Sequence, residues 1–476
     1  MHHGPERETS GEEAAVEIYR SCFALAKKPS LEARSRLLPL LIRAQVRPIV
    51  DRVLDMIREM PPRHRDALYT EMRRLFAESG HREVVKFAMA VLGLFRRMED
   101  LSLLRTIARH EEFTSFAIVE IAQILEDPTQ EWMAMARQVT GWGKIELVEQ
   151  LLKNPGPEVC AFLLREGCVN DVHWGYTALP IAVGCRLHEA LAVEDLDLPL
   201  LQGAGAILET LAEDSVGGGP DGDMLDYPQA GDATEVFLLR FERVAQTLRD
   251  FMVVAAIQDF VTSDIEPDKL RAAGWSQARR DTARTICKRI LTMPEWRKRA
   301  EAGLDSSDER ERWVAPEVAR RIGLPMEEWL VPRIRRNPLD SHLWWYMVWG
   351  ADEARMDEAI NLTKELLDPE SVATGPTANV RGHGPGYEIH DCMDMIVQEL
   401  RRFPGKGWEL IRPSLLSPVV RNRSMAIQAL KAWGVGHLTL EMVDAVHASL
   451  EDPSKHVRRD AREILGLPDT ERFAHP

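Results

Sequence analysis

The helical spacing of the apolar residues constrains the fold of this chain more than any other feature. From Val16 onward these residues recur at intervals of three and four, and almost nowhere do they alternate with period two over the length of a strand. One apolar stripe consists of Leu68, Met72, Leu75 and Phe76. Pro61 and Pro62 precede it and Gly80 follows it, which are common start and stop residues of helices. Similar stripes follow after short links, so the sequence predicts an all-α protein of antiparallel helix pairs.

Two segments near the C-terminus, 415–434 and 450–466, align without gaps at an offset of 35 residues. The matched pairs are Pro418 with Pro453, Arg423 with Arg458, Ala426 with Ala461, and Leu430 with Leu465. A period of this length fits a two-helix repeat of the HEAT type. Ser417 and Asp452 each precede a proline, so we expect them to be N-cap residues. These observations predict an α-solenoid, or α-α superhelix, of HEAT-like helical hairpins.

Composition along the chain suggests two helical arrays. Residues 1–13 are polar and charged and are expected to be disordered. Residues 213–234 are rich in glycine and acidic residues, which predicts a flexible linker. The acidic residues there lack the spacing of a calcium-binding loop. The linker separates an N-terminal array, 14–212, from a C-terminal array, 235–476, which contains the repeats at about 415–466.

Charge and composition narrow the classes of function. The formal net charge of −15 leaves no excess of Lys and Arg to neutralise a phosphate backbone, which argues against DNA or RNA as a partner. The six cysteines are scattered without a C-x-x-C pair, so reduced thiols are expected. No secretory signal is visible, and the longest apolar run, 251–257, is far too short to span a membrane. We therefore expect a cytoplasmic protein without membrane association, whose oligomeric state the sequence leaves open.

Several short words are distinctive. They are His-Glu-Glu-Phe-Thr at 110–114, Gly-Trp-Gly-Lys-Ile at 141–145, Ala-Thr-Gly-Pro at 373–376, Arg-Arg-Phe-Pro-Gly-Lys-Gly-Trp at 401–408, and Ser-Pro-Val-Val-Arg-Asn-Arg at 417–423. Through them the chain resembles a family of uncharacterised bacterial HEAT-like proteins, some of which carry the label limonene hydroxylase. The resemblance implies a helical-repeat fold and, through the label, an oxygenase. It brings no catalytic residue with it.

One cluster has the composition of a metal or polar site. It consists of His383, Glu388, His390, Asp391, Cys392 and Asp394. If a helix begins at about Glu388, then His390 and Asp394 share one face, and His383 could fold back to complete a metal site. Alternatively, Cys392 belongs to the apolar core, and the acidic residues merely favour the N-terminus of the helix. Both interpretations remain open at this point.

Two aromatic clusters are candidates for a binding surface. The candidate residues are His173, Trp174 and Tyr176 in a predicted turn, and Arg335, Arg336, His342 and Trp344 further along the chain. Aromatic residues beside arginines are typical of interface hot spots. Because Trp345 and Trp349 are four residues apart, they are predicted to face the core, which leaves His342 and Trp344 as the exposed members.

Two classes of function fit these features. The favoured prediction is a scaffold that recognises a protein or peptide of basic or mixed charge, because solenoids expose long binding surfaces. The alternative is an enzyme, either the oxygenase of the family label or a metal-assisted hydrolase that uses residues 383–394. An oxygenase requires haem, flavin or iron, for which the sequence has no motif, so no cofactor is predicted. A DNA glycosylase, also known among HEAT-like folds, is a third option that the net charge opposes.

Overall fold

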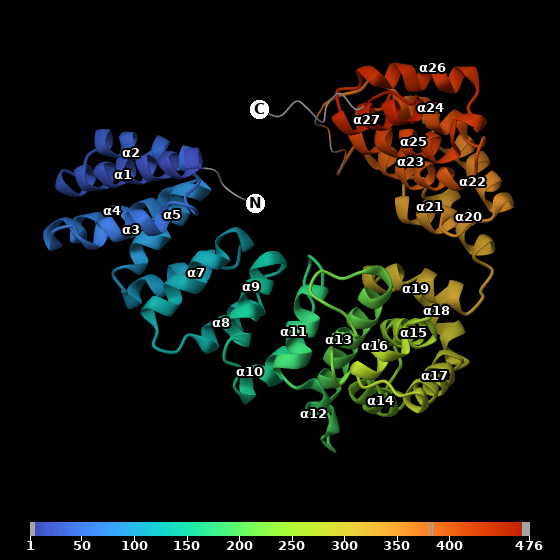
Figure 1. Ribbon diagram of the computed structural model, residues 1–476, viewed down its shortest axis with the longest axis horizontal. Helices are drawn as coiled ribbons and strands as arrows, with labels where there is room; N and C mark the ends of the chain where they lie inside the picture. Colours follow the sequence, from blue (N-terminus) through green and yellow to red (C-terminus); the bar gives the residue numbers. More distant parts are fainter. Residues whose placement is uncertain (1–4, 379, 381, 383, 469–476) are drawn as a thin grey trace. The chain divides into compact units, whose positions relative to one another are not determined.

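The computed structural model describes residues 5–378, 380, 382 and 384–468. Over these residues the chain forms 27 α-helices joined by short links, with no β-strand and one isolated bridge between Val380 and Val419 (Figure 1). The all-α prediction is therefore confirmed. Within the same ranges, no helix combines the length and the apolar character needed to cross a membrane.

The chain divides into two compact units, Met1–Trp296 and Arg297–Pro476. The predicted linker, 213–234, lies inside the first unit. Helix α13 (Leu198–Gly217) extends into it, and Met224 and Tyr227 are fully buried. The segment is thus packed, in contrast to the flexible linker that the sequence predicts. Helix α1 likewise begins at Pro5, within the range that was expected to be disordered.

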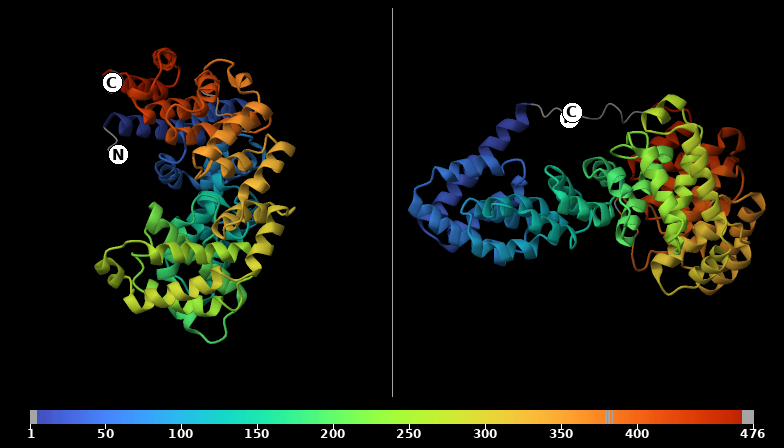
Figure 2. Two further views of the ribbon diagram at one scale, coloured as in Figure 1. Left: turned by 90° about the vertical axis from the view of Figure 1, so that its right-hand side faces the viewer. Right: turned by 90° about the horizontal axis from the view of Figure 1, so that it is seen from below.

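In the first unit, alternate helices form a row. Each helix of the row packs on the next one in the order α5, α7, α9, α11, α13, α15 and α17. The helices between them cover the row (Figures 1 and 2). The bounds are α1 (Pro5–Lys27), α2 (Leu31–Ala44), α3 (Val50–Arg58), α4 (Pro62–Glu78), α5 (Arg82–Gly93), α6 (Leu101–Ile107), α7 (Glu111–Ile124), α8 (Thr129–Ala136), α9 (Gly141–Leu152), α10 (Pro157–Phe162), α11 (Gly175–Gly184), α12 (Leu187–Ala192), α13 (Leu198–Gly217), α14 (Ala230–Phe241), α15 (Leu248–Thr262), α16 (Pro267–Ala272) and α17 (Gln277–Leu291).

The second unit has a similar row, made of α21, α23, α25 and α27. Helices α20, α22, α24 and α26 pack beside it. The bounds are α18 (Glu295–Leu304), α19 (Glu309–Arg321), α20 (Met326–Arg336), α21 (Ser341–Val348), α22 (Glu353–Leu366), α23 (Glu388–Glu399), α24 (Trp408–Leu415), α25 (Val420–Trp433), α26 (Leu440–Ala448) and α27 (Lys455–Ile464).

Local sequence explains where the helices begin and which faces they bury. Helix α4 begins at Pro62, where a proline costs no hydrogen bond, and the predicted stripe Leu68, Met72, Leu75 and Phe76 is buried. Helix α5 is buried along most of its length, as expected for a helix in the middle of a stack. Each buried Leu, Val or Phe side chain contributes roughly 1.5–3 kcal/mol by leaving water.

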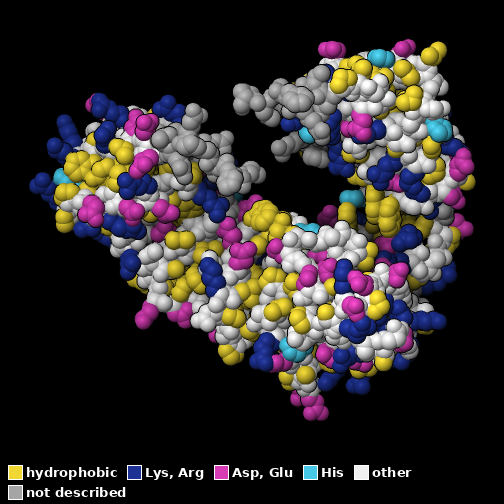
Figure 3. Space-filling model, in the orientation of Figure 1, with side chains coloured by type: hydrophobic (Ala, Val, Ile, Leu, Met, Phe, Trp, Pro, Cys, Tyr) yellow, Lys and Arg dark blue, Asp and Glu magenta, His cyan; other side chains and the backbone are white. Residues whose placement is uncertain are grey.

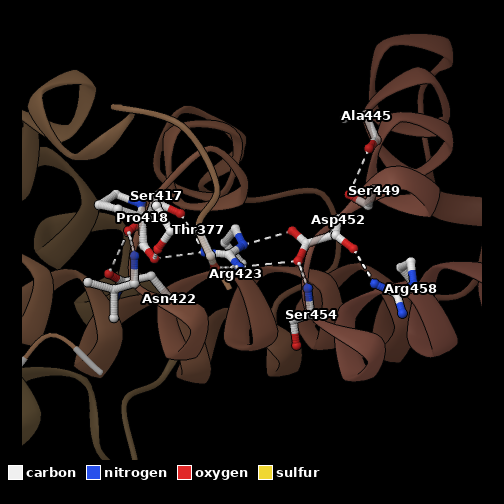
Figure 4. A network of polar contacts seen from close by, with 11 residues as sticks. Thr377, Ser417, Pro418, Asn422, Arg423, Ala445, Ser449, Asp452, Ser454 and Arg458 are labelled. Carbon is white, nitrogen blue, oxygen red and sulfur yellow. Dashed lines mark hydrogen bonds and ion pairs between the residues drawn. The ribbon is translucent and has the colours of Figure 1, made fainter. Parts of the chain in front are cut away.

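A buried arginine joins the two segments that align at an offset of 35 residues (Figure 4). Arg423 is fully buried, and its Nε donates to Asp452 Oδ2 at 2.7 Å while Nη1 donates to the carbonyl of Ser417 at 2.7 Å. The matched Arg458 donates from Nη1 to the carbonyl of Asp452 at 2.6 Å. Each arginine therefore binds the carbonyl group six residues before it. Arg423 also binds the side chain of Asp452, in the turn that precedes α27.

The predicted N-caps at Ser417 and Asp452 are wrong. Helix α25 begins at Val420 and α27 at Lys455, each three residues after the predicted cap. Ser417 Oγ accepts the N–H of Val419 at 3.1 Å, and Asp452 Oδ1 accepts the N–H of Ser454 at 2.7 Å. Both side chains thus close a turn before the helix, because the residue that precedes a proline favours extended backbone.

Candidate functional site

Helix α23 carries five of the six candidate ligands of the 383–394 cluster and begins at Glu388, as the sequence predicts. His383 lies outside the described residues. Across the described part of the chain, no group of three or more His, Cys, Asp and Glu side chains is placed to hold a metal ion.

The polar side chains of α23 bind neighbouring elements. His390 Nδ1 lies 2.9 Å from Asn422 Oδ1 and 3.1 Å from the hydroxyl of Ser417, and all three side chains are buried. Asp394, on the same helix, forms an ion pair with Arg421. Both residues therefore attach α23 to α25 and to the turn that precedes it.

Cys392 and Glu388 match the structural alternative for this cluster. The thiol of Cys392 is fully buried with its Sγ 3.7 Å from the carbonyl of Pro338, and burial raises its pKa to about 12. A thiol of that pKa is a poor nucleophile and metal ligand at neutral pH. Glu388 accepts the N–H of Gly386 at 2.9 Å, at the start of the helix.

The turn that carries His173, Trp174 and Tyr176 is fixed by the buried side chain of Asn170. Its Oδ1 accepts the N–H of His173 at 2.9 Å, and its carbonyl accepts Nε1 of Trp174 at 2.8 Å. His173 is exposed and Tyr176 is half-buried, with the ring of Tyr176 centred 5.0 Å from that of the exposed Trp142. Trp174 is half-buried, and the aromatic rings that remain accessible here are those of Tyr176 and of Trp142 at the start of α9.

A cavity of about 290 Å³ lies in the second unit, where α19, α20 and α21 meet the end of α18. We call it the α19–α21 pocket. Its lining residues are Leu304, Asp305, Ser306, Glu309, Arg312, Trp313, Pro316, Trp329, Arg333, Arg336, Asn337, Asp340, His342, Leu343 and Tyr346. Its volume is near the lower end of the range for small-molecule sites, roughly 300 Å³, and suits one or two amino-acid side chains.

Aromatic residues form the walls of the α19–α21 pocket. Trp313 is 58% exposed, and its ring meets the His342 ring edge to face at a centroid distance of 4.5 Å. Tyr346 Oη donates to the carbonyl of Trp313 at 2.8 Å, which fixes α21 against α19. The guanidinium of Arg333 lies 4.1 Å from the centre of the Trp329 ring. Hydrophobic side chains gather at α21 on the face shown in Figure 3.

Charged groups in the pocket are partly paired. Arg333 forms an ion pair with Asp305, and Asp340 caps α21 by accepting the N–H of His342 at 3.2 Å. The side chain of Arg336 lines the pocket without a hydrogen-bond or ion-pair partner among the described residues. The pocket therefore offers the guanidinium of Arg336 to a bound acceptor.

The sequence located this region and the exposed His342, but it misplaced Trp344. His342 and Arg336 line the pocket, whereas Arg335 points to Glu365 and forms a two-pronged ion pair with it. Trp344 is fully buried, with Nε1 donating to the carbonyl of Pro338 at 2.7 Å, so its predicted exposure is wrong.

The pattern around residue 344 explains this error. Trp344 shares its buried face with Met347 and Val348 at helical spacing, and α21 ends at Val348, before the second tryptophan of the presumed Trp345–Trp349 pair. Those two rings instead stack on each other at 4.8 Å and are half-buried.

Trp313 was not among the candidates, although the sequence holds a signal for it. Its neighbours one turn away on either side are Glu309 and Glu317, so this tryptophan belongs to no apolar stripe and is expected at the surface. An isolated exposed tryptophan beside arginines is typical of a binding hot spot.

Comparison with known proteins adds nothing to this geometry. No protein-family model matches the chain, and no curated protein matches it.

Proposed function

We propose that this chain is a scaffold of HEAT-like helical repeats that binds a partner polypeptide in the α19–α21 pocket. The observation that carries the proposal is the exposed Trp313, which lines a cavity of about 290 Å³; its ring packs on His342 and its backbone carbonyl accepts Tyr346 Oη. Rows of alternately packed helices in both units support the repeat architecture, in which binding surfaces are typical. All six cysteines are free thiols, which fits the predicted cytoplasmic location.

The pocket favours a segment of mixed character. A large apolar side chain of the partner would pack against Trp313, since aromatic contacts supply much of the affinity of peptide interfaces. An acidic residue beside this anchor would pair with Arg336, which has no carboxylate partner among the described residues. Arginine binds carboxylates through two parallel hydrogen bonds, so this pair would also fix the direction of the peptide.

Selection from a displayed library of random peptides tests the proposal. The full-length protein serves as the target, and the Trp313→Ala variant serves for counter-selection. We expect enriched peptides to contain a large apolar residue next to Asp or Glu. Fluorescence anisotropy of one labelled peptide should then show at least about tenfold weaker binding to Trp313→Ala and to Arg336→Glu, because each variant removes one hot-spot contact.

Trp142→Ala is the matched control, because Trp142 is 51% exposed but lies in the other unit. The peptide should bind this variant as it binds the unmodified protein. Enrichment of the same peptides by the Trp313→Ala variant, or equal loss of binding in the Trp142 control, would contradict the proposed site.

A further inference from the structure

A second cavity, in the first unit, has a different chemistry. Its volume is about 560 Å³, and it lies between the end of α3, the start of α4, the turn after α5 and the end of α7. Its lining residues are Ile57, Arg58, Pro62, Arg65, Asp66, Leu94, Phe95, Arg96, Arg97 and Gln123. Four arginines and a single carboxylate thus line one cavity in a chain whose net charge is −15. We call it the arginine cavity.

Two of these arginines have carboxylate partners and the other two do not. Arg58 pairs with Asp55, and Arg97 lies 3.5 Å from Asp66 and 3.6 Å from Glu99. In contrast, the guanidinium of Arg96 donates to the neutral side chain of Gln123, at 3.1 Å, and to no carboxylate in the described part of the chain. The guanidinium of Arg65 has no hydrogen-bond or ion-pair partner in the described part of the chain. The cavity therefore keeps positive charge that its own carboxylates do not cancel.

The backbone at Arg96 has an unusual conformation. Its φ is +50°, in the left-handed region that glycine or asparagine usually occupies after a helix. The N–H of Arg96 closes the turn after α5 by donating to the carbonyl of Gly93 at 3.2 Å. A glycine would relieve the strain but remove the guanidinium, so this position carries a cationic side chain at a cost in backbone energy. Such strain is common where a residue serves a ligand.

Two neighbouring features strengthen the potential for anions. Helix α4 contributes its first turn to the cavity, and no side chain caps its N-terminus, so the positive end of the helix dipole faces this region. Glu120, which interacts electrostatically with Arg58, has its pKa raised to about 8 by burial. It is therefore mostly protonated at neutral pH and cancels little of the positive charge.

Arg97 is held in place over the ring of Tyr69, 3.8 Å from its centre.

We propose that the arginine cavity binds a small molecule that carries at least two phosphate groups. Guanidinium groups match the geometry of phosphate oxygens, and several of them around one cavity suit a ligand with more than one such group. The volume exceeds the space that a single phosphate needs, and the apolar side chains of Ile57, Leu94 and Phe95 leave room for an organic portion. This site is separate from the peptide pocket and does not depend on it.

Isothermal titration calorimetry with inorganic pyrophosphate tests this inference on the full-length protein. We expect saturable binding at one site in 150 mM salt, and weaker binding of citrate, which tests whether carboxylates are the intended anions. The Arg96→Gly variant should bind pyrophosphate at least about tenfold more weakly, because a charge-assisted contact is lost. It should remain folded by circular dichroism, since glycine accepts the local backbone conformation. Arg65→Ala should weaken binding similarly.

Arg186→Gly is a closely matched control. Arg186 is also an exposed arginine of the first unit with a φ of +51°, but it lies before α12 and pairs with Glu189, outside the cavity. This variant should bind pyrophosphate with unchanged affinity. The inference is overturned if pyrophosphate shows no saturable binding, if citrate binds at least as tightly, or if Arg96→Gly and Arg186→Gly have the same effect.

Discussion

Replacing Arg423 by methionine should destabilise the second unit more than any surface substitution. Arg423 is fully buried and donates five hydrogen bonds, two to the carboxylate of Asp452 and three to the carbonyls of Ser417, Pro418 and Thr377. Methionine retains most of the apolar volume but leaves the carboxylate, only 3% exposed, without its cation. Removing one partner of a buried ion pair typically costs about 3–5 kcal/mol.

The assay is thermal and urea unfolding, followed by circular dichroism and tryptophan fluorescence. For a unit of this size, 3–5 kcal/mol corresponds to a fall in midpoint of roughly 6–20 °C. Arg459→Met is the control, because Arg459 is exposed, lies 3.6 Å from Asp460 and leaves that carboxylate its ion pair with Lys431, so its loss should cost at most about 1 kcal/mol. The Arg423→Met/Asp452→Asn double variant should recover part of the loss, since it removes the unpaired charge. A change below about 1 kcal/mol for Arg423→Met would refute the reasoning.

Three further predictions concern stability. Gly203→Ala should destabilise the first unit by about 1–3 kcal/mol in urea unfolding, because its Cβ would lie 2.0 Å from the backbone carbonyl of Leu164, whereas Gly217→Ala in the same helix meets nothing and should be neutral or stabilising. Trp344→Ala should cost about 3–5 kcal/mol and Trp313→Ala less than about 1 kcal/mol; equal effects would contradict the assigned burial. Burial raises the pKa of Glu120 to about 8. The protonated Glu120 therefore contributes its full stability below the pKa that this carboxyl has in the unfolded chain, and the contribution is lost as pH rises toward 8. Unfolding midpoints between pH 5 and pH 8 should therefore vary less in Glu120→Gln than in the unmodified protein, and identical profiles would count against a buried, protonated Glu120.

Much of the fold is predictable from the sequence because helical periodicity repeats along the chain. The stripe of α4 and the start of α23 at Glu388 illustrate this, since both depend on residues within one or two turns. The caps at Ser417 and Asp452 were misplaced by two residues, because a side chain that can cap a helix can equally close the turn before it.

The segment 213–234 shows a second limit. Its glycines and acidic residues are as typical of a tight turn between packed helices as of a linker. The distinguishing signal is the presence of Met224 and Tyr227, two large side chains that a solvated linker would leave exposed. The N–H of Met224 donates to the carbonyl of Leu211, 3.0 Å away, which holds the returning chain against α13.

Neither cavity could be derived from the sequence. The arginine cavity assembles residues from four elements between positions 57 and 123, so its charge is invisible in any single stretch of the chain. The sequence predicted part of the α19–α21 pocket, namely His342 and Arg336, because aromatic and basic residues there are close in sequence. The direction of each tryptophan in that region depends on where α21 ends, which local periodicity does not define.

The pairing of Arg423 with Asp452 determines where this chain can be divided. Arg423 lies in α25 and Asp452 lies in the turn before α27. The buried arginine therefore depends on a carboxylate about thirty positions further along the sequence. A deletion or exchange that separates them would strand a buried charge, whereas one that moves both would not. The loops between helices of the second unit therefore differ in how well they should tolerate recombination. Segments that contain both residues are the natural modules for duplication or transplantation.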